Sequence, residues 1–201
     1  SDGVKDALQR FIAEHKQVIP TVREWFTDNG GEFCSSDIDE FCHEIAVVRR
    51  YSVPYCPPQN GTAERLWGLL LQPMRIMFHA SRVPRTFWPE CMEHCTMLHN
   101  ALSKNKGLSP LERAGLPPIN HDKFRQFGCK VYFNIPHVRY RVGFRLKKLA
   151  DSAVLGVHLG CDPERPGGYR IFLPQLNKIV SAYHLEWFET RFCNFSTVPN
   201  V

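Results

Sequence analysis

The sequence predicts an α/β protein in which a mixed helix–strand part is followed by a small β-barrel. Helical periodicity alternates with short β-prone runs up to about residue 103, whereas β-prone runs separated by turn residues fill 127–188. A stretch rich in Pro, Gly and Ser lies between these parts, at 104–118. We therefore expect a first domain at 1–103, a linker at 104–124, a β-barrel at 125–190 and a tail at 191–201.

Three short elements are expected at the start of the chain. Residues 4–14 place their apolar side chains on one helical face, which predicts an amphipathic helix. The run VREWFT at 22–27 predicts a strand that ends just before Asp28. The NGGE segment at 29–32 then supplies the residue types of a turn.

A second helix and a second strand are expected next. Ser35 or Ser36 can cap a helix, because their hydroxyls accept hydrogen bonds from free backbone N–H groups. The side chains that this helix would bury are Ile38, Phe41, Cys42 and Ile45. The apolar run IAVV at 45–48 predicts a strand, and the Pro-rich stretch at 52–61 excludes regular structure.

The clearest helical periodicity in the chain begins just after this Pro-rich stretch. Its expected buried face consists of Ala63, Leu66, Trp67, Leu70, Leu71, Met74, Met77 and Phe78. The opposite face carries Glu64, Gly68, Gln72 and Arg75. Pro73 lies inside this helix, where loss of a backbone hydrogen bond is expected to kink it at a cost of about 3 kcal/mol. A further helix at 85–102 is expected to pack against it, and the β-prone runs that follow are KVYFNI, AVLGVHLG, YRIFL and KIVSAYHL.

The composition is that of a globular intracellular protein. Charged residues make up 22% of the 201 and apolar residues 43%, and the sequence has no apolar run of the ~20 residues that a membrane span needs. We therefore expect no membrane association. The eight cysteines are scattered, which favours reduced and mostly buried thiols over disulfides.

Charge is distributed unevenly along the chain. Residues 1–64 carry six basic and eleven acidic side chains, whereas 65–201 carry nineteen basic and nine acidic ones. This asymmetry indicates an acidic, metal-binding end and a basic end that faces nucleic acid, with an ordinary solvated surface as the alternative.

Asp28 and Glu64 are the candidate catalytic and metal-binding carboxylates. Asp28 ends an expected strand and Glu64 opens an expected helix, with 35 residues between them. Phosphoryl transfer between nucleic-acid strands commonly uses two Mg²⁺ ions held by carboxylate oxygens, because Mg²⁺ is a hard cation. The spacing alone is also compatible with two solvated surface acids.

The residues around this pair resemble a known family. TDNGGEF at 27–33 and YSVPYCPPQNGTAERL at 51–66 resemble the catalytic core of copia-like LTR retrotransposon integrases, in the retroviral integrase superfamily. The downstream segments TFWPE, SPLERAG, FGCKVYFNIP and PGGYRIF resemble the rest of such proteins. The resemblance implies an α/β fold with a partial RNase H-like core at 1–103 and an SH3-like β-barrel at 125–190.

This resemblance also implies a function. Asp28 and Glu64 fall on the second and third members of a three-carboxylate site that holds Mg²⁺ or Mn²⁺. The implied reaction is DNA integration, by 3′-end processing and strand transfer. The implied partners are DNA, as element ends and target duplex, and further copies of the chain, with the nucleus as the place of action.

Two features set this chain apart from the family pattern. The family's first catalytic Asp and its upstream His/His/Cys/Cys zinc domain have no counterpart in the sequence, so we expect the isolated chain to be inactive. Trp67 and Gly68 stand where relatives commonly carry a polar or basic pair, and Pro73 interrupts the same helix. The alternative is therefore a decayed or domesticated remnant, a non-catalytic module that binds nucleic acid or protein.

Candidate nucleic-acid contacts occur in both parts of the chain. The run HVRYRVGFRLKK at 137–148 interleaves basic and aromatic side chains without an acid, which suits contact with phosphates and bases. A charged loop or edge strand is the alternative. The predicted contact residues are Arg49, Arg50, Asn60, Arg75, Arg139, Arg141, Arg145, Lys147 and Lys148.

Four potential zinc ligands share one helical face in the second part of the α/β region. They are Cys91, His94, Cys95 and His99, at i, i+3, i+4 and i+8. A single straight helix rarely wraps four tetrahedral ligands around one ion, so we interpret this face as core, with a zinc module as the alternative.

Overall fold

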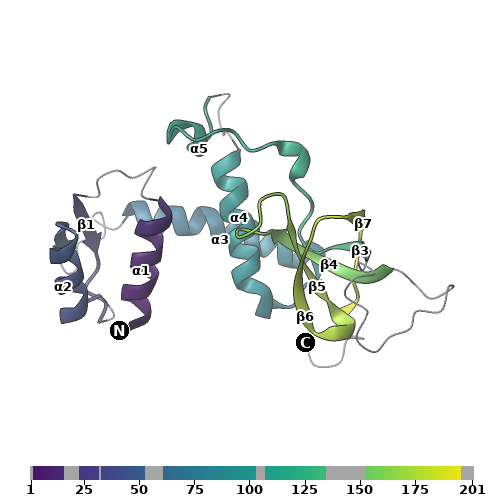
Figure 1. Cartoon of the computed structure of the whole chain (residues 1–201), viewed down its shortest axis with the longest axis horizontal. Coiled ribbons are helices and arrows are strands. Elements are labelled where there is room, and N and C mark those ends of the chain that lie inside the picture. The colour runs from purple at the N-terminus through teal and green to yellow at the C-terminus, as the bar shows by residue number, and fades with distance from the viewer. Residues whose placement is uncertain are drawn as a thin grey trace. The chain divides into compact units, whose positions relative to one another are not determined.

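The computed structural model describes residues 2–15, 23–31, 33–52, 61–102, 107–134 and 153–195 (Figure 1). The chain forms two compact units. The first comprises Ser1–Gly68 with Leu111–Pro117, and the second comprises Leu69–Pro110 with Pro118–Val201. None of the described helices is long and apolar enough to cross a membrane.

The first unit combines helices with a small parallel sheet. Its elements are α1 (Asp2–His15), β1 (Glu24–Thr27), α2 (Ser36–Glu44), β2 (Val48–Tyr51) and the first residues of α3 (Gly61–Ser81). The strands β1 and β2 pair in parallel, with Glu24 opposite Val48 and Thr27 opposite Tyr51. Both expected helices are confirmed, and α2 buries the expected Ile38, Phe41 and Cys42.

The second strand begins at Val48, so the prediction of a strand at 45–48 is wrong. Residues 45–47 instead form the turn that closes α2, with Val47 N–H donating to the Cys42 carbonyl at 2.9 Å. Ala46 has a φ of +55°, a left-handed conformation that breaks both helix and strand. The apolar residues of the run are therefore used to end a helix rather than to extend a strand.

The second unit pairs helices with an antiparallel sheet. Its helical elements are the remainder of α3, η2 (Arg85–Phe87), α4 (Trp88–Ala101) and η3 (His121–Lys123), while α5 (Pro110–Arg113) lies where the two units divide. The strands are β3 (Cys129–Asn134), β4 (Ala153–Cys161), β5 (Tyr169–Leu173), β6 (Lys178–Ala182) and β7 (Leu185–Phe192), with η5 (Pro174–Leu176) between β5 and β6. Their order in the sheet is β6-β5-β4-β3-β7.

The last β-prone run forms two strands rather than one. KIVSAYHL is interrupted after Ala182, and Leu185 begins β7, which pairs with β3 at the opposite edge of the sheet from β6. Within the described strands the order is that of an open sheet, without a recorded pairing between β6 and β7. The expected tail at 191–201 starts inside this region, because β7 continues to Phe192.

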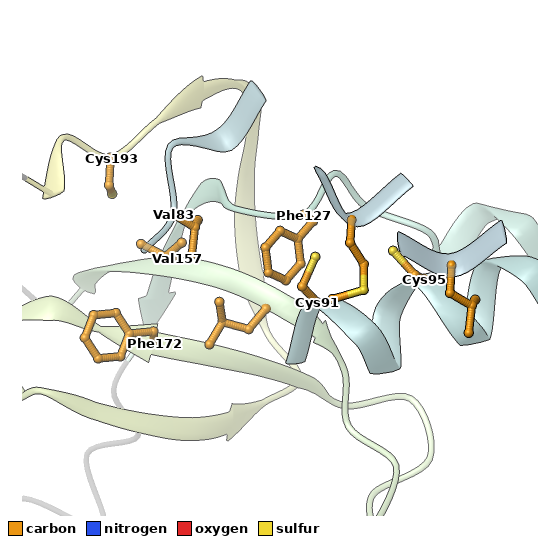
Figure 2. Packing of buried hydrophobic residues seen from close by; sticks show 10 residues of the cluster. Val83, Cys91, Cys95, Phe127, Val157, Phe172 and Cys193 are labelled. Atoms are coloured by element: carbon orange, nitrogen blue, oxygen red, sulfur yellow. The ribbon is translucent and has the colours of Figure 1, made fainter. Parts of the chain in front are cut away.

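Helices and sheet of the second unit share one apolar core. Figure 2 shows part of it: Val83, Cys91 and Cys95 from the helical segment meet Phe127, Val157 and Phe172 from the β-rich segment. A second apolar cluster on the sheet contains Cys129, Val131, Ile171, Leu173 and Ala182. The compact units thus divide the chain at other points than the expected boundaries, and the assignment of 1–103 to one domain stays a prediction.

The expected buried face of α3 is correct only in its second half. Leu70 and Met74 are buried, whereas Leu66 and Trp67 are 47% and 50% exposed and Ala63 is exposed too. The helix continues through Pro73 without ending. Periodicity alone predicts which residues share a face, but burial requires a partner surface, and the core described above begins at Leu70.

Close packing at Gly128 yields a first testable prediction. Gly128 has a φ of +76°, and a Cβ there would lie 2.3 Å from the Ser81 Cβ and 2.7 Å from a Val83 methyl. Gly128→Ala should therefore lower the free energy of unfolding by about 2–4 kcal/mol, since backbone strain adds to overpacking.

Gly167 provides a matched control in the same unit. Its φ is +81°, but a Cβ there would meet nothing within 4 Å, so Gly167→Ala should cost only about 1 kcal/mol. Urea unfolding of the two variants measures the difference. Equal midpoints would contradict the packing of residue 128 against Ser81.

Candidate functional site

Asp28 lies directly after β1, at the carboxyl end of the parallel strand pair. Ser52 follows β2 at the same end, where its N–H donates to the Thr27 carbonyl at 2.9 Å. Asn29 Nδ2 in turn donates to the Ser52 carbonyl at 3.1 Å. The Asp28 carboxylate is exposed and accepts the Gly30 N–H at 3.2 Å, so a local turn orients it at the strand end.

Glu64 lies in the first turn of α3 and is exposed. The partial positive charge of a helix N-terminus stabilises a carboxylate at this position. Glu64 and Asp28 belong to the same compact unit. Asn60, expected beside them, lies outside the described residues.

The donor chemistry of these two carboxylates suits Mg²⁺, but two donors do not complete a site. Within the described ranges, no group of three or more His, Cys, Asp or Glu side chains is placed to hold a metal ion. The described contacts also include none between Asp28 and Glu64. Their convergence on one metal site stays a prediction.

Arg49 is held inside the first unit rather than offered to a ligand. Its side chain is only 7% exposed, and its guanidinium donates to the Asp39 carboxylate and to the Phe33 carbonyl. It also lies over the Tyr51 ring, 4.7 Å from the ring centroid. If the Arg49 guanidinium moved to a phosphate, the Asp39 carboxylate and the Phe33 carbonyl would lose these hydrogen bonds. The geometry therefore favours a structural role over the predicted DNA contact.

Arg50 and Arg75 are more accessible. Arg50 pairs with Glu24 across the two parallel strands through two hydrogen bonds of 2.9 Å, and both side chains remain about half exposed. This hydrogen bonding lowers the pKa of Glu24. Arg75 is exposed on α3. The remaining predicted contacts lie outside the described residues: Arg139, Arg141, Arg145, Lys147 and Lys148.

Comparisons with known proteins find similarity to retrovirus-related proteins. Residues 129–200 match the family described as the retroviral polymerase SH3-like domain. The retrovirus-related Pol polyprotein from transposon TNT 1-94 of Nicotiana tabacum is 26% identical over 90% of this chain. Those from transposons RE2 and RE1 of Arabidopsis thaliana are each 28% identical, over 67% and 84% of it. The chain is a homologue of retrovirus-related Pol polyproteins.

This Pol-related chain spans 10–13% of the length of these relatives. A chain from the simian T-cell lymphotropic virus intasome in complex with PP2A regulatory subunit B56 gamma also aligns with it, over 95% of this chain and 62% of that one. That alignment has 19% identity and a TM-score of 0.49, which is too low to assign a fold.

The predicted Cys/His face of α4 is part of the core of the second unit. Cys91, His94 and Cys95 are buried, and the Cys95 thiol lies 3.6 Å from the Met77 sulfur. A hydrogen bond with Cys95 and burial raise the pKa of the Cys91 thiol, the same hydrogen bond lowers the pKa of Cys95, and burial lowers the pKa of His94 to about 4. A protonated Cys91 thiol and a neutral imidazole are the forms expected of core side chains.

The expectation of reduced cysteines holds for those that the structure describes. The seven described cysteines are free, and five of them are buried. Burial raises the pKa of Cys129 to about 12, which keeps that thiol protonated near neutral pH.

A buried aromatic cluster around His158 was not predicted. His158 hydrogen-bonds through Nδ1 with the Gln126 carbonyl at 3.0 Å and meets the rings of His94, Tyr169 and Trp187 edge-on, at 5.1–5.7 Å between centroids. His158 occupies a β-prone run in which nothing marks a histidine as special. The sequence held no signal for this cluster, because His158 meets His94 only through the packing of α4 against β4.

Arg170 is a second feature that the sequence did not reveal. Its guanidinium donates to Glu90 at 3.0 Å and to Glu93 at 2.9 Å, so it ties β5 to α4. The two carboxylates are spaced for one helical face, but their cation follows 77 residues later.

The two buried histidines predict a pH-dependent stability. Burial lowers the pKa of His158 to about 3 and that of His94 to about 4, whereas an unfolded histidine has a pKa near 6.5. Below pH ~6.5 the unfolded chain therefore binds more protons than the native one. Stability should be full above pH ~6.5 and fall by a few kcal/mol as the pH drops toward 4.

Urea unfolding at several pH values between roughly 4.5 and 7.5, on both sides of the unfolded pKa near 6.5, would measure how the free energy of unfolding changes with pH. His94→Phe should flatten it, while substitution of the exposed His121 by Gln should leave it unchanged. A slope in His94→Phe equal to that of the wild type would show that His94 does not contribute to the pH dependence.

Adjacent arginines on β2 predict different effects on stability. Arg49→Gln should lower the free energy of unfolding by about 1–3 kcal/mol, because a buried guanidinium that serves a carboxylate and a carbonyl is lost. Arg50→Gln should cost less than about 1 kcal/mol, since its ion pair is exposed. Thermal unfolding compares the two, and a larger loss in Arg50→Gln would refute the structural role of Arg49.

Proposed function

We propose that this chain is part of a retrotransposon integrase and belongs to a metal-dependent polynucleotidyl transferase. The observation that carries the proposal is the presence of two exposed carboxylates in one compact unit, Asp28 at the carboxyl end of β1 and Glu64 in the first turn of α3. The proposed activity is DNA integration, by 3′-end processing and strand transfer. Its partners would be DNA and further copies of the chain, acting in the nucleus.

The first unit would then belong to an RNase H-like core. Its two parallel strands leave apolar side chains uncovered, with Phe26 58% and Val48 55% exposed. Apolar strand residues at this exposure are more usual where further elements complete the sheet. This supports the proposal that β1 and β2 are two strands of a larger sheet.

Asp28 and Glu64 would hold Mg²⁺ or Mn²⁺ jointly with a third carboxylate. Among the described residues, no third metal-ligating side chain is grouped with them. The bound ions would supply activation of the attacking oxygen and stabilisation of the leaving oxygen. The Gly30 N–H holds the Asp28 carboxylate in a local turn, and the partial positive charge of the helix N-terminus favours a carboxylate at the position of Glu64. With two of three carboxylates, the isolated chain would bind DNA without transferring strands.

A non-catalytic nucleic-acid-binding module is the second candidate. The observation that favours it is Trp67, which is 50% exposed and follows Glu64, the proposed metal ligand, by less than one helical turn. In this case the first unit would be a scaffold, and binding would depend on the basic residues of 65–201.

Charge removal at the two carboxylates tests the DNA binding that both candidates share. The double variant Asp28→Asn, Glu64→Gln should bind a fluorescent random-sequence DNA duplex as tightly as the wild type or more tightly, because two charges that repel phosphate are lost. Fluorescence anisotropy measures this in the isolated chain, with and without Mg²⁺.

The catalytic part needs the chain fused to an upstream segment that carries the missing carboxylate. Such a fusion should transfer strands in Mg²⁺ and lose this activity in either single variant, whereas Glu40→Gln, at an exposed acid of α2, should retain it. A fusion inactive despite binding DNA would leave the scaffold function. Activity that survives both substitutions would refute the assignment of Asp28 and Glu64.

A further inference from the structure

A basic pocket lies at the end of α3 in the second unit. Its volume is about 620 Å³. The residues that line it are Arg75, Phe78, His79, Arg82, Val83 and Arg85. All of them fall within Leu69–Pro110, so the pocket belongs to a single compact unit. We call it the Arg82 pocket.

The helical repeat places two cations of the Arg82 pocket together. Arg75 and His79 are spaced i and i+4, which brings them onto one stripe of the helix end, and Arg82 directly follows Ser81, the last residue of α3. Leu70 and Met74 are buried in the core instead. The cationic stripe is therefore held in place by the packing of the same helix.

The apolar wall of the pocket is anchored in this core. Val83 is 4% exposed, and the Phe78 ring packs edge-on against Phe127, with 6.2 Å between centroids. A wall fixed by packing gives the surrounding cations a defined position, which is what separates a binding site from a mobile charged surface.

The turn after α3 places Arg82 and Arg85 at the pocket. Arg82 has a φ of +56° and its N–H donates to the Phe78 carbonyl at 3.0 Å, so the helix ends there in a left-handed residue. Glycine is the common residue at such a position, and arginine costs about 1 kcal/mol. Pro84 then leads into η2, which starts at Arg85.

The charges of the pocket lack partners among the described residues. Arg75, Arg82 and Arg85 are exposed, and no described hydrogen bond or ion pair engages their guanidinium groups. The arginines that do pair with carboxylates lie elsewhere: Arg49, Arg50, Arg125 and Arg170. No acid lines the pocket, and its three formal charges exceed the roughly half negative charge of a helix C-terminus.

We propose that the Arg82 pocket binds a phosphate of a nucleic-acid backbone. Planar guanidinium groups match phosphate oxygens in two-pronged hydrogen bonds, and an anion relieves the mutual repulsion of three cations around one cavity. The inference rests on the proposed function, in which the chain binds DNA. Contact with the backbone would position the duplex without reading its sequence.

The test compares two double variants of the full chain. Arg82→Gln, Arg85→Gln removes two cations from the pocket, and Arg113→Gln, Arg165→Gln removes two exposed cations outside it. Binding of a fluorescent random-sequence DNA duplex is followed by anisotropy across a salt series. The pocket variant should bind at least about tenfold more weakly at low salt, and its log–log salt slope should shrink by about 2. The control variant should keep more of its DNA affinity and more of its salt slope than the pocket variant.

Each other outcome overturns the inference in a recognisable way. If the pocket variant binds like the control while the wild type binds DNA, the pocket assignment fails and the proposed function stands. If the wild type does not bind DNA at all, the proposed function fails as well. If the chain binds polyglutamate rather than DNA through the same arginines, the pocket recognises an acidic peptide instead.

Folding is controlled separately. Because no described hydrogen bond or ion pair engages the guanidinium groups of Arg82 and Arg85, the thermal midpoint of the pocket variant should equal or exceed that of the wild type. Arg82→Lys, Arg85→Lys keeps the charge and loses the planar fork, so its affinity should fall between those of the wild type and the Gln variant. A Lys variant as weak as the Gln variant, with a lowered midpoint, would attribute the loss to folding and refute the inference.

Discussion

Burial of the helical segment against the antiparallel sheet is the constraint on which the second unit depends. Cys91 and Val157 are fully excluded from solvent, and Phe127 joins the same cluster with α3 and α4. Neither the helices nor the sheet could bury these faces alone, because each presents an apolar surface that requires a partner. The close approach of Gly128 to Ser81 follows from the same contact, since it leaves no room for a side chain.

The same packing determines where charge is available for a ligand. Arginines that face a carboxylate are used internally: Arg170 links β5 to α4, and Arg49 links β2 to α2 and the turn that precedes it. The cations at the end of α3 have no acid beside them among the residues that line their pocket. A guanidinium can therefore contribute to stability or to binding according to its neighbours, and its identity in the sequence does not distinguish the two.

The long helix α3 carries functional candidates at both ends. Glu64 lies in its first turn, where the helix N-terminus favours negative charge, and the Arg82 pocket lies where it ends. Between them, Leu70 and Met74 anchor the helix in the core. The proposed metal ligand thus belongs to the first compact unit and the proposed phosphate site to the second.

Local pattern in the sequence determined the longer helices, most of the strands, the strand-end position of Asp28 and the helix-start position of Glu64. These follow from periodicity and turn residues, which act over a few residues. Tertiary structure decided the rest. Arg49 came to donate to Asp39 and Phe33, Leu66 and Trp67 stayed exposed, and His158 came to face His94, because each outcome depends on which distant surface lies beside the residue. The spacing of residues along the chain gives no information about that distant surface.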